Sequence, residues 1–537
     1  MNKTLPSMNP IAHLKRTVQT TLILAVLLLG ASVESSQAQT AEDALLFTQR
    51  LPGTGARSIG LSGTGIAGLG DYSDFFTNPA GLGYVKQSQV SAALNFLSAT
   101  NEGFVSAQGF GNPIEEELTD QSLSNFAGIY KIPTNQGALV LGATYNQTSS
   151  FSRNLFFQGL TNEESITDVL LPFDDEFQIG ESDGIFFPEF FADLPEIAYL
   201  GGAVEFLSEN VGTDGPLFYQ AVNPGSTIQQ SSDVFQEGSL KELSFGGAVE
   251  AAKGVMIGAS LNFSFGRYEF ESFFDEFDIN GENTSDLYVV IDGDTEYQGF
   301  DQVTYTERFE SELIGANLRV GVSAEAAPGA RVGLTIETPT FYRVDEAFET
   351  EVATFFDNGL SLAYGGQPGD IGRGTFEYDI TTPWRFGGGL SYSISGLTVL
   401  GDLELVDWSQ MELDASSDRN FFADINRSIR DDFKAVVNSS IAAEYTFNNF
   451  TARVGYALQP DPNDGLLSLG DGTALDPDNK RSYVSAGFGF TFSNAFAINF
   501  GWMQETQEDI YIPDFTTYTV TEDIIRNHFQ LGLSILL

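Results

Sequence analysis

The sequence contains no cysteine among its 537 residues. Disulfides, thiolate metal ligands and cysteine nucleophiles are therefore excluded, so an exported chain of this size must be stabilised by packing. Histidine is nearly absent too, since only His13 and His528 occur. His13 lies in a segment with the features of a leader, so histidine-based triads and zinc sites are nearly excluded. We expect no catalytic residues, no metal site and no cofactor.

Basic residues are also scarce, with 25 Lys and Arg against 73 Asp and Glu, and the formal net charge is −48. A field of this sign repels nucleic acid, so we expect no nucleic-acid partner. Carboxylates are too numerous for any pair of them to mark a catalytic site.

The sequence has a single long apolar run, at residues 21–30. Lys3, Lys15 and Arg16 precede this run, and the small-x-small sequence Ser36-Gln37-Ala38 follows it. This order predicts a secretory signal peptide over residues 1–38, with the mature chain starting near Gln39. The run is about half of the ~20 residues of a spanning helix, which disfavours the alternative of an N-terminal anchor.

Without another apolar run, the exported chain is either soluble or a β-barrel, because only helices and closed barrels satisfy their backbone groups in lipid. Alternation of apolar and small polar residues is the main positive signal. From Val255 to Gly266, the odd-numbered residues are apolar or alanine, and the even-numbered residues are Met, Gly, Ser or Asn. Side chains of a strand point to opposite faces in turn, so this pattern predicts a strand with one apolar face.

The alternation recurs along the chain, and short connections alternate with long ones. Short turns at one end and long loops at the other are typical of outer-membrane barrels. The Gly- and Ser-rich polar faces favour a crowded lumen over a soluble sandwich. We therefore predict an all-β transmembrane antiparallel barrel over residues 86–537. Its fourteen predicted strands are 86–98, 124–133, 136–149, 239–252, 254–274, 300–326, 328–355, 372–395, 396–413, 433–448, 449–460, 480–493, 495–510 and 525–537.

A glycine-rich segment, residues 39–85, precedes the first predicted strand. It is too apolar for a linker and alternates poorly. A segment in this position can plug the lumen of a barrel that would otherwise leak. We predict an N-terminal hatch, and a mobile periplasmic tail is the alternative.

Within this segment, residues 55–67 (GARSIGLSGTGIA) and 71–82 (DYSDFFTNPAGL) resemble the hatch of the outer-membrane long-chain fatty-acid transporter family (FadL-type). Asn78, Pro79, Ala80 and Gly81 match the hatch motif of that family. Segments at 305–308, 337–342, 382–386, 405–409 and 452–456 also look like members of it. The resemblance implies a plugged fourteen-stranded barrel in the Gram-negative outer membrane, which takes up fatty acids or other hydrophobic compounds passively.

The resemblance also implies where ligand would pass. Leu45, Leu46 and Phe47 would lie nearest a ligand pocket, whereas Asn78 and Pro79 would shape the plug. Pro79 biases Asn78 toward an extended conformation. An ordinary surface turn is the alternative for this motif. The family places a lateral opening at the third strand, where Gly142 could permit a bend.

The longest predicted loop, 150–238, suits a capture surface because it is rich in phenylalanine, and residues 192–209 could form a short helix within it. Exposed aromatic clusters often mark binding sites. We single out Phe186, Phe187, Phe190 and Phe191 as ligand-binding candidates. The alternative is that these rings pack on one another to fold the loop.

The acidic loop at 461–479 does not have the spacing of an EF-hand, so a solvated loop is favoured over a Ca²⁺ site. The partners we expect are fatty-acid-like hydrophobic molecules, outer-membrane lipids and, during biogenesis, the barrel-assembly machinery. Two other functions stay open, namely a non-transport barrel of a secretion system (a type IX shuttle or scaffold) and a general porin. The enzyme alternative, a phospholipase or protease barrel, lacks a nucleophile motif.

Overall fold

The computed structural model describes residues 40–537 except 108, 183, 214, 284–287, 293–294, 417–419, 465–466, 469–473, 476–478, 493–494, 514–515 and 517. The predicted signal peptide, residues 1–38, lies outside the described residues. No described helix is long and apolar enough to cross a membrane.

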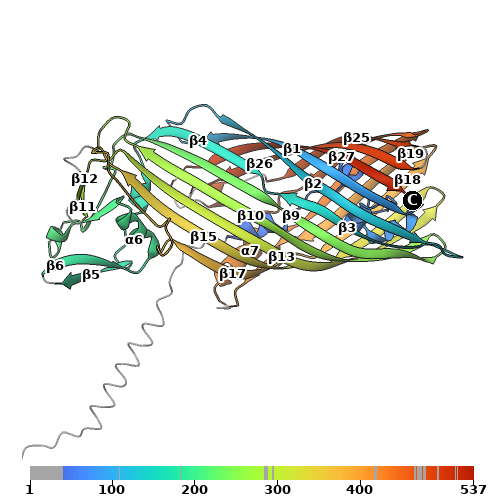
Figure 1. Cartoon of the computed structure of the whole chain (residues 1–537), viewed down its shortest axis with the longest axis horizontal. Helices are drawn as coiled ribbons and strands as arrows, with labels where there is room; N and C mark the ends of the chain where they lie inside the picture. The colour runs from blue at the N-terminus through green and yellow to red at the C-terminus, as the bar shows by residue number, and fades with distance from the viewer. Residues whose placement is uncertain are drawn as a thin grey trace, which may run out of the picture.

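Fourteen antiparallel wall strands form a closed barrel, as predicted. Successive wall strands pair with each other, and the last pairs with the first to close the ring (Figure 1). The uninterrupted strands are β1 (Gln89–Val105), β2 (Ile114–Ile132), β3 (Leu139–Ser150), β9 (Ile228–Ala252), β10 (Val255–Phe277), β13 (Gln302–Ala327), β21 (Ala435–Phe447), β22 (Phe450–Gln459), β25 (Arg481–Phe492), β26 (Phe496–Tyr511) and β27 (Val520–Leu536).

The other three wall strands are each broken in two, where the sequence had suggested continuous strands. The broken pairs are β14 (Ala330–Glu337) with β15 (Phe341–Phe355), β17 (Arg373–Thr381) with β18 (Arg385–Ile394), and β19 (Leu397–Asp407) with β20 (Glu412–Asp414). Pro339 and Pro383 lie in two of the breaks, and proline has no N–H to donate to a ladder. The third break is a short 3₁₀ turn, η3 (Trp408–Gln410).

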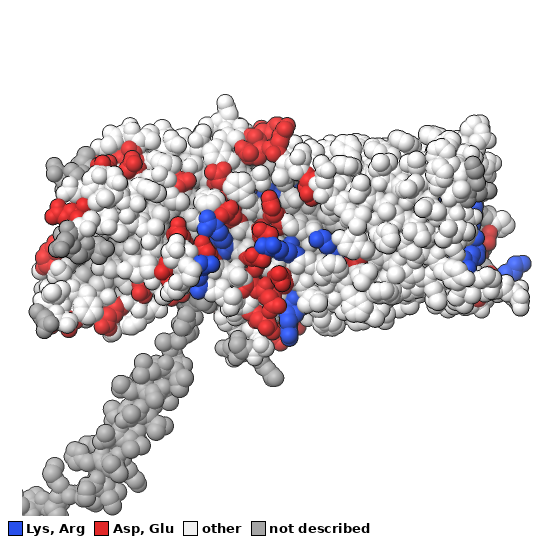
Figure 2. Space-filling view, in the orientation of Figure 1, with Lys and Arg blue, Asp and Glu red and all other residues white. Residues whose placement is uncertain are grey.

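The apolar faces of the strands point outward. On β10, Ile257, Leu261 and Phe263 are 42–46% exposed, whereas Ser260 and Asn262 are buried. The outward apolar residues of all wall strands make up what we call the apolar belt, which is the surface a barrel presents to lipid. On the face shown in Figure 2, charged side chains gather near the middle of the molecule. Between them and the charged rim at the short-turn end lies a broad band almost free of charge.

The N-terminal segment, residues 40–85, lies inside the ring. It contains α2 (Ala41–Thr48), α3 (Ala56–Ile59), α4 (Asp74–Thr77) and η1 (Pro79–Tyr84). Its backbone approaches wall glycines on separate parts of the ring. A Cβ added to Gly258 of β10 would lie 2.3 Å from the Pro79 carbonyl carbon, and one on Gly501 of β26 would lie 2.3 Å from the Ala56 oxygen. The lumen-facing glycines therefore make room for this segment.

The strands continue beyond the apolar belt into a folded cap, which replaces most of the predicted long loops. The predicted loop at 99–123 was wrong, because β1 and β2 extend through most of it. The predicted helix at 192–209 is shorter, as α6. The cap consists of β4 (Arg153–Thr161), α5 (Ile166–Val169), β5 (Phe177–Ser182), β6 (Ile185–Phe190), α6 (Asp193–Leu200), β7 (Val204–Phe206), η2 (Ser208–Asn210), β8 (Phe218–Gln220), β11 (Val289–Asp292), β12 (Thr295–Gln298) and β16 (Ser361–Tyr364).

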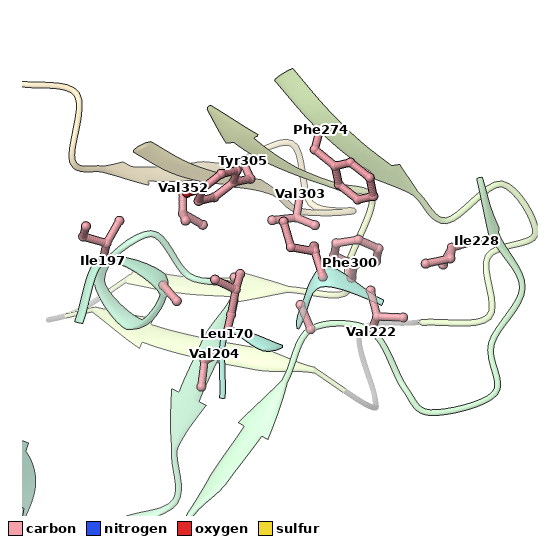
Figure 3. Packing of buried hydrophobic residues seen from close by; sticks show 14 of the residues in the cluster. Leu170, Ile197, Val204, Val222, Ile228, Phe274, Phe300, Val303, Tyr305 and Val352 are labelled. Carbon is pink, nitrogen blue, oxygen red and sulfur yellow. The ribbon is translucent and has the colours of Figure 1, made fainter. Parts of the chain in front are cut away.

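A hydrophobic core joins the cap to the ends of the wall strands. Figure 3 shows Ile197 of α6 and Leu170 of the cap facing Val303 and Val352 of the wall. Elsewhere, α7 (Ala423–Asp432) packs against α2, and the short strands β23 (Leu467–Ser468) and β24 (Ala474–Leu475) form a separate pair. The end of the barrel opposite the short turns is thus covered by packed residues.

Candidate functional site

Buried ion pairs fasten the N-terminal segment to the wall. Arg50 Nη1 lies 2.8 Å from Glu337 Oε2, and Arg50 Nη2 lies 2.8 Å from Glu404 Oε1. Arg319, whose side chain is 1% exposed, lies 2.9 Å from the same Glu337 oxygen and donates to the Phe75 carbonyl at 2.6 Å. Charge-assisted hydrogen bonds of this kind are stronger than neutral ones. They fasten the segment to the wall strands that carry Arg319, Glu337 and Glu404.

A second anchor lies nearer the short turns. Arg57 of α3 bridges Glu444 of the wall at 2.9 Å and Asp71 of its own segment at 2.8 Å. The Asp402 carboxylate accepts hydrogen bonds from the backbone of Gly65 and Ile66 at 2.6 and 2.9 Å. The segment is therefore bound to the wall both around Arg50 and, nearer the short turns, around Arg57.

The four residues of the predicted hatch motif, Asn78, Pro79, Ala80 and Gly81, are all buried, so they do not form a surface turn. Asn78 is extended, as the following proline predicts, with φ −152° and ψ 108°. Its side chain accepts from the Ala80 N–H at 3.0 Å and donates to the Ile66 carbonyl at 2.7 Å. The Asn78 side chain thus links two turns of the segment.

Two of the predicted pocket residues, Leu45 and Phe47, lie in a packed apolar core. The Phe47 ring packs edge-on against the rings of Phe151 and Tyr268, at 5.8 and 5.4 Å between centroids. Leu46 lines a small cavity of about 40 Å³. Ligand contact by these three residues stays a prediction.

The wall ladder parts beside this cavity. Pairing between β2 and β3 ends at Asn125 and Asn146, and the register of β3 on β9 shifts between Gln147 and Ser149. Beyond that point β2 pairs with β1 alone, whereas β4 follows β9. We call this gap between β2 and the β3–β4 junction the wall break. A hydrogen bond of 2.6 Å from Ser122 Oγ to Gln147 Oε1 crosses it.

The wall break lies at the upper edge of the apolar belt. Gln147 is opposite Lys241 of β9, which is opposite Phe265 of β10. Phe265 is the last exposed apolar residue of β10 before the charged Arg267 and Glu269. The predicted gate residue, Gly142, is instead in intact ladder, opposite Ile129 and Gly246. Its predicted role as a gate stays untested, and the parting itself lies further along β3.

Polar side chains from three wall strands line the cavity behind the wall break, namely Arg481 of β25, Glu505 of β26, and Arg526 and His528 of β27. Sequence reasoning did not find this group. Its members are far apart in the chain, and no short motif marks them. Only the strand register brings Glu505 opposite Arg526.

The four phenylalanines singled out in the sequence divide between two environments. Phe190 packs against Tyr199 and Phe218, with ring centroids 5.6 and 5.9 Å apart, and Phe186 is half-buried. Phe187 and Phe191 are 38% and 58% exposed. Packing is thus observed for Phe190, and capture by Phe187 and Phe191 stays a prediction. Exposed Phe173 and Ile185 extend the apolar surface of the cap.

The acidic loop at 461–479 lies partly outside the described residues. Among the residues that the structure does describe, no group of three or more His, Asp or Glu side chains is arranged to hold a metal ion.

No family model and no curated protein matches the chain. Among solved structures, it is similar to a Pseudomonas aeruginosa FadL homologue, with a TM-score of 0.52 and 10% identity over 90% of this chain and 99% of that one. It is also similar to the P. putida toluene transporter TodX, with a TM-score of 0.49 and 12% identity over 91% and 99% of the two chains. The Ralstonia pickettii toluene transporter TbuX gives a TM-score of 0.43 and 14% identity over 89% and 98%. The first similarity shows that the barrel has the fold of a FadL homologue.

Proposed function

We propose that this protein resides in the outer membrane of a Gram-negative bacterium and takes up fatty acids or other hydrophobic compounds passively, releasing them sideways into the membrane. The wall break carries this proposal. The wall parts at the upper edge of the apolar belt, while residues 40–85 fill the lumen and are ion-paired to its wall. The proposed route for an apolar molecule therefore runs through the wall and not along the lumen. The fold shared with a FadL homologue supports this function.

Capture would begin on the cap. Phe173, Ile185, Phe187 and Phe191 expose apolar surface there. An apolar molecule loses water-exposed surface when it binds such a patch. The aromatic patch therefore suits first contact with a sparingly soluble compound.

The driving force would be transfer of the ligand from water to the membrane. Each buried methylene contributes about 0.8 kcal/mol, so a twelve-carbon chain gains on the order of 9 kcal/mol. No energy source needs to be coupled to a barrel that works downhill. The wall break lies at the depth where the apolar belt ends. A ligand that leaves there would enter the outer leaflet of the membrane.

A cross-link across the wall break tests the release step. The chain has no cysteine, so Ser122→Cys with Gln147→Cys introduces the only thiols, and a short cleavable bifunctional reagent joins them. The matched control is Tyr130→Cys with Leu141→Cys, which are opposite each other in the intact part of the same ladder. Uptake of radiolabelled 1-dodecanol and laurate is measured in cells with an intact lipopolysaccharide leaflet.

We expect the cross-link at the wall break to abolish most uptake, and cleavage of the reagent to restore it, while the control cross-link has little effect. Equal uptake by both cross-linked proteins would show that release is not at this gap. Absence of uptake together with a stable protein partner would favour a secretion-system barrel. Ion conductance with residues 40–85 in place would favour a porin.

A further inference from the structure

A larger cavity, of about 560 Å³, lies at the other end of the barrel, between the N-terminal segment and the short turns. Residues 68–72 and 84–87 of the N-terminal segment line one side of it. Wall residues next to the short turns line the rest, such as Ser393 and Thr398 on either side of the turn between β18 and β19. We call this cavity the short-turn vestibule. It shares no lining residue with the cavity behind the wall break.

The short-turn vestibule has an excess of positive charge, although acidic residues outnumber basic ones in the chain by 73 to 25. Its charged lining residues are the cations Arg57, Lys86, Arg331 and Arg453 and the carboxylates Asp71 and Glu444. Lys and Arg side chains are also visible on the rim at this end in Figure 2. A concave surface with a charge of one sign attracts ligands of the opposite sign. The vestibule therefore suits an anion, which most of the surface of this protein would repel.

Both carboxylates of the vestibule are already paired with two of its arginines. Glu444 lies 2.9 Å from Arg57 and 2.6 Å from Arg453, and Asp71 lies 2.8 Å from Arg57. These contacts fasten the N-terminal segment to the wall and neutralise Arg57 and Arg453. The excess charge is therefore carried by the other two cations, Lys86 and Arg331.

Arg331 is fixed in position without a carboxylate partner. Its guanidinium lies 4.0 Å from the centroid of the Tyr84 ring, and its Nη1 donates to the Gly68 carbonyl at 3.2 Å. Glu325 is opposite Arg331 in the β13–β14 ladder, but among the described residues neither Arg331 nor Lys86 has a carboxylate oxygen within 4 Å. A stacked guanidinium loses little conformational freedom when it binds, and its remaining N–H groups match a carboxylate.

Gln89 of β1 adds a buried donor to the same lining. The residue is 8% exposed, yet its Nε2 has no hydrogen-bond partner among the described residues. Buried polar groups are nearly always paired, so this amide calls for an acceptor in the vestibule. Six serine and threonine residues from five wall strands also line the cavity. Their hydroxyls can both donate to and accept from a ligand.

We propose that the short-turn vestibule binds an acidic, extended segment of a periplasmic protein. Carboxylates of the segment would pair with Arg331 and Lys86, and its backbone would hydrogen-bond to Gln89 and to the hydroxyls. A single small anion would leave most of these groups unused, because they are spread around a cavity with room for a ligand of many atoms. A peptide has N–H and C=O groups along its whole length. The placement of this end in the periplasm rests on the proposed outer-membrane location, but the binding itself does not depend on uptake.

The test uses the purified full-length protein in detergent micelles, with isothermal titration calorimetry. The probe is an acetylated and amidated octapeptide of alternating glycine and glutamate, and the uncharged comparison has glutamine in place of glutamate. Binding is measured for the unmodified protein and for Arg331→Gln and Lys86→Gln. The matched control is Lys253→Gln, because Lys253 is also an exposed lysine at the short-turn end but does not line the vestibule. The denaturation midpoint reports whether each variant has folded.

We expect the glutamate peptide to bind and the glutamine peptide not to bind. Arg331→Gln should raise the Kd about tenfold, because a hydrogen bond between charged groups is lost. Lys86 is exposed, so Lys86→Gln should raise the Kd less, by about threefold, and added salt should weaken binding further. Lys253→Gln should leave the Kd within about 1.5-fold, as expected for a charge outside the site. Lys86→Gln gives a second reading if Arg331→Gln does not fold.

Four results would overturn the site. Equal effects of Lys86→Gln and Lys253→Gln would reduce the binding to the general charge of the rim. Displacement of the peptide by inorganic phosphate at equal concentration would show a small-anion site. Tighter binding of a purified cell-wall stem peptide would replace the protein partner by the cell wall, and no binding of the glutamate peptide would remove the site altogether. Uptake of laurate and 1-dodecanol is measured separately, so failure of the transport proposal is distinguishable from failure of this one.

Discussion

Removing the charge of Glu337 should weaken the buried ion pairs that fasten Arg50 of the N-terminal segment to the wall. Glu337 lies between two guanidiniums, with Arg50 Nη1 at 2.8 Å and Arg319 Nε at 2.9 Å. Its side chain is 9% exposed and that of Arg319 is 1% exposed. In Glu337→Gln, Arg319 would keep Glu242 at 3.3 Å, and Arg50 would keep Glu404 at 2.8 Å. Two buried cations would each lose one of two carboxylates.

Breaking a buried ion pair by removing one partner costs about 3–5 kcal/mol. Because each guanidinium retains a second carboxylate, the lower end of that range, about 3 kcal/mol, is expected here. The free energy of unfolding can be measured by equilibrium denaturation of the barrel in detergent micelles or lipid vesicles. Denaturation followed by tryptophan fluorescence gives the midpoint and slope for each variant.

The matched control is an ion pair of the same chemistry on the outer surface. Arg343 lies 3.3 Å from Glu377, with side chains 56% and 52% exposed. Glu377→Gln should therefore change the free energy of unfolding by less than about 1 kcal/mol. If Glu337→Gln lowers the free energy of unfolding no more than Glu377→Gln does, the lumenal ion pairs do not hold the N-terminal segment in place. That result would refute the reasoning.

Three further predictions follow from single sites. Gly321→Ala should destabilise the barrel by about 1–3 kcal/mol, because the added Cβ would lie 1.8 Å from the buried side-chain oxygen of Asn78. The control is Gly128→Ala, whose Cβ would meet nothing within 4 Å and which should leave the free energy of unfolding nearly unchanged. Phe187→Ser should reduce uptake of an apolar compound without changing the denaturation midpoint, and the packed Phe190→Ser should lower the midpoint as well; unchanged uptake in Phe187→Ser would count against capture. Burial raises the pKa of Glu276, near the cap end of β10, to about 7. The stability that the protonated Glu276 contributes is therefore present below its ordinary pKa near 4.5 and is lost as the pH rises through 7. The backbone N–H of Ile166 in α5 donates to Glu276. Hydrogen exchange of α5, corrected for intrinsic rates, should therefore become faster as the pH rises, and Glu276→Gln should remove this pH dependence.

The wall could be predicted from the sequence because the apolar belt imposes a local pattern. Every second residue of a wall strand contacts lipid, so the period of two is visible within a single strand, as at Ile257, Leu261 and Phe263. The same reasoning failed above the belt. There both faces of a strand are polar, so β2 was predicted to begin at residue 124 but begins at Ile114, and β9 was predicted to begin at 239 but begins at Ile228.

The site was less predictable than the wall, because it depends on register between strands distant in sequence. Asn78 could be assigned to the plug from a contiguous motif, since its partners are close along the chain. Arg481 and His528 carry no such signal, because their shared cavity exists only once β25, β26 and β27 are aligned. The location of the wall break was missed for a related reason. A glycine such as Gly142 suggests a bend, but the parting is a change of partner strand that the residues of β3 alone do not encode.

The distribution of arginine connects the plug to the mode of release. Arg50 and Arg57 come from the N-terminal segment, and each contacts a carboxylate of the wall, Glu404 and Glu444 respectively. The segment therefore supplies cations to lumenal carboxylates that would otherwise repel one another, and the lumenal glycines hold its backbone against the wall. Moving the segment aside for each ligand would break two sets of buried ion pairs at once, at a cost of several kcal/mol for each. Across the wall break, among the described residues, Ser122 donates a hydrogen bond to Gln147. We therefore expect the exit proposed above to leave these buried ion pairs in place.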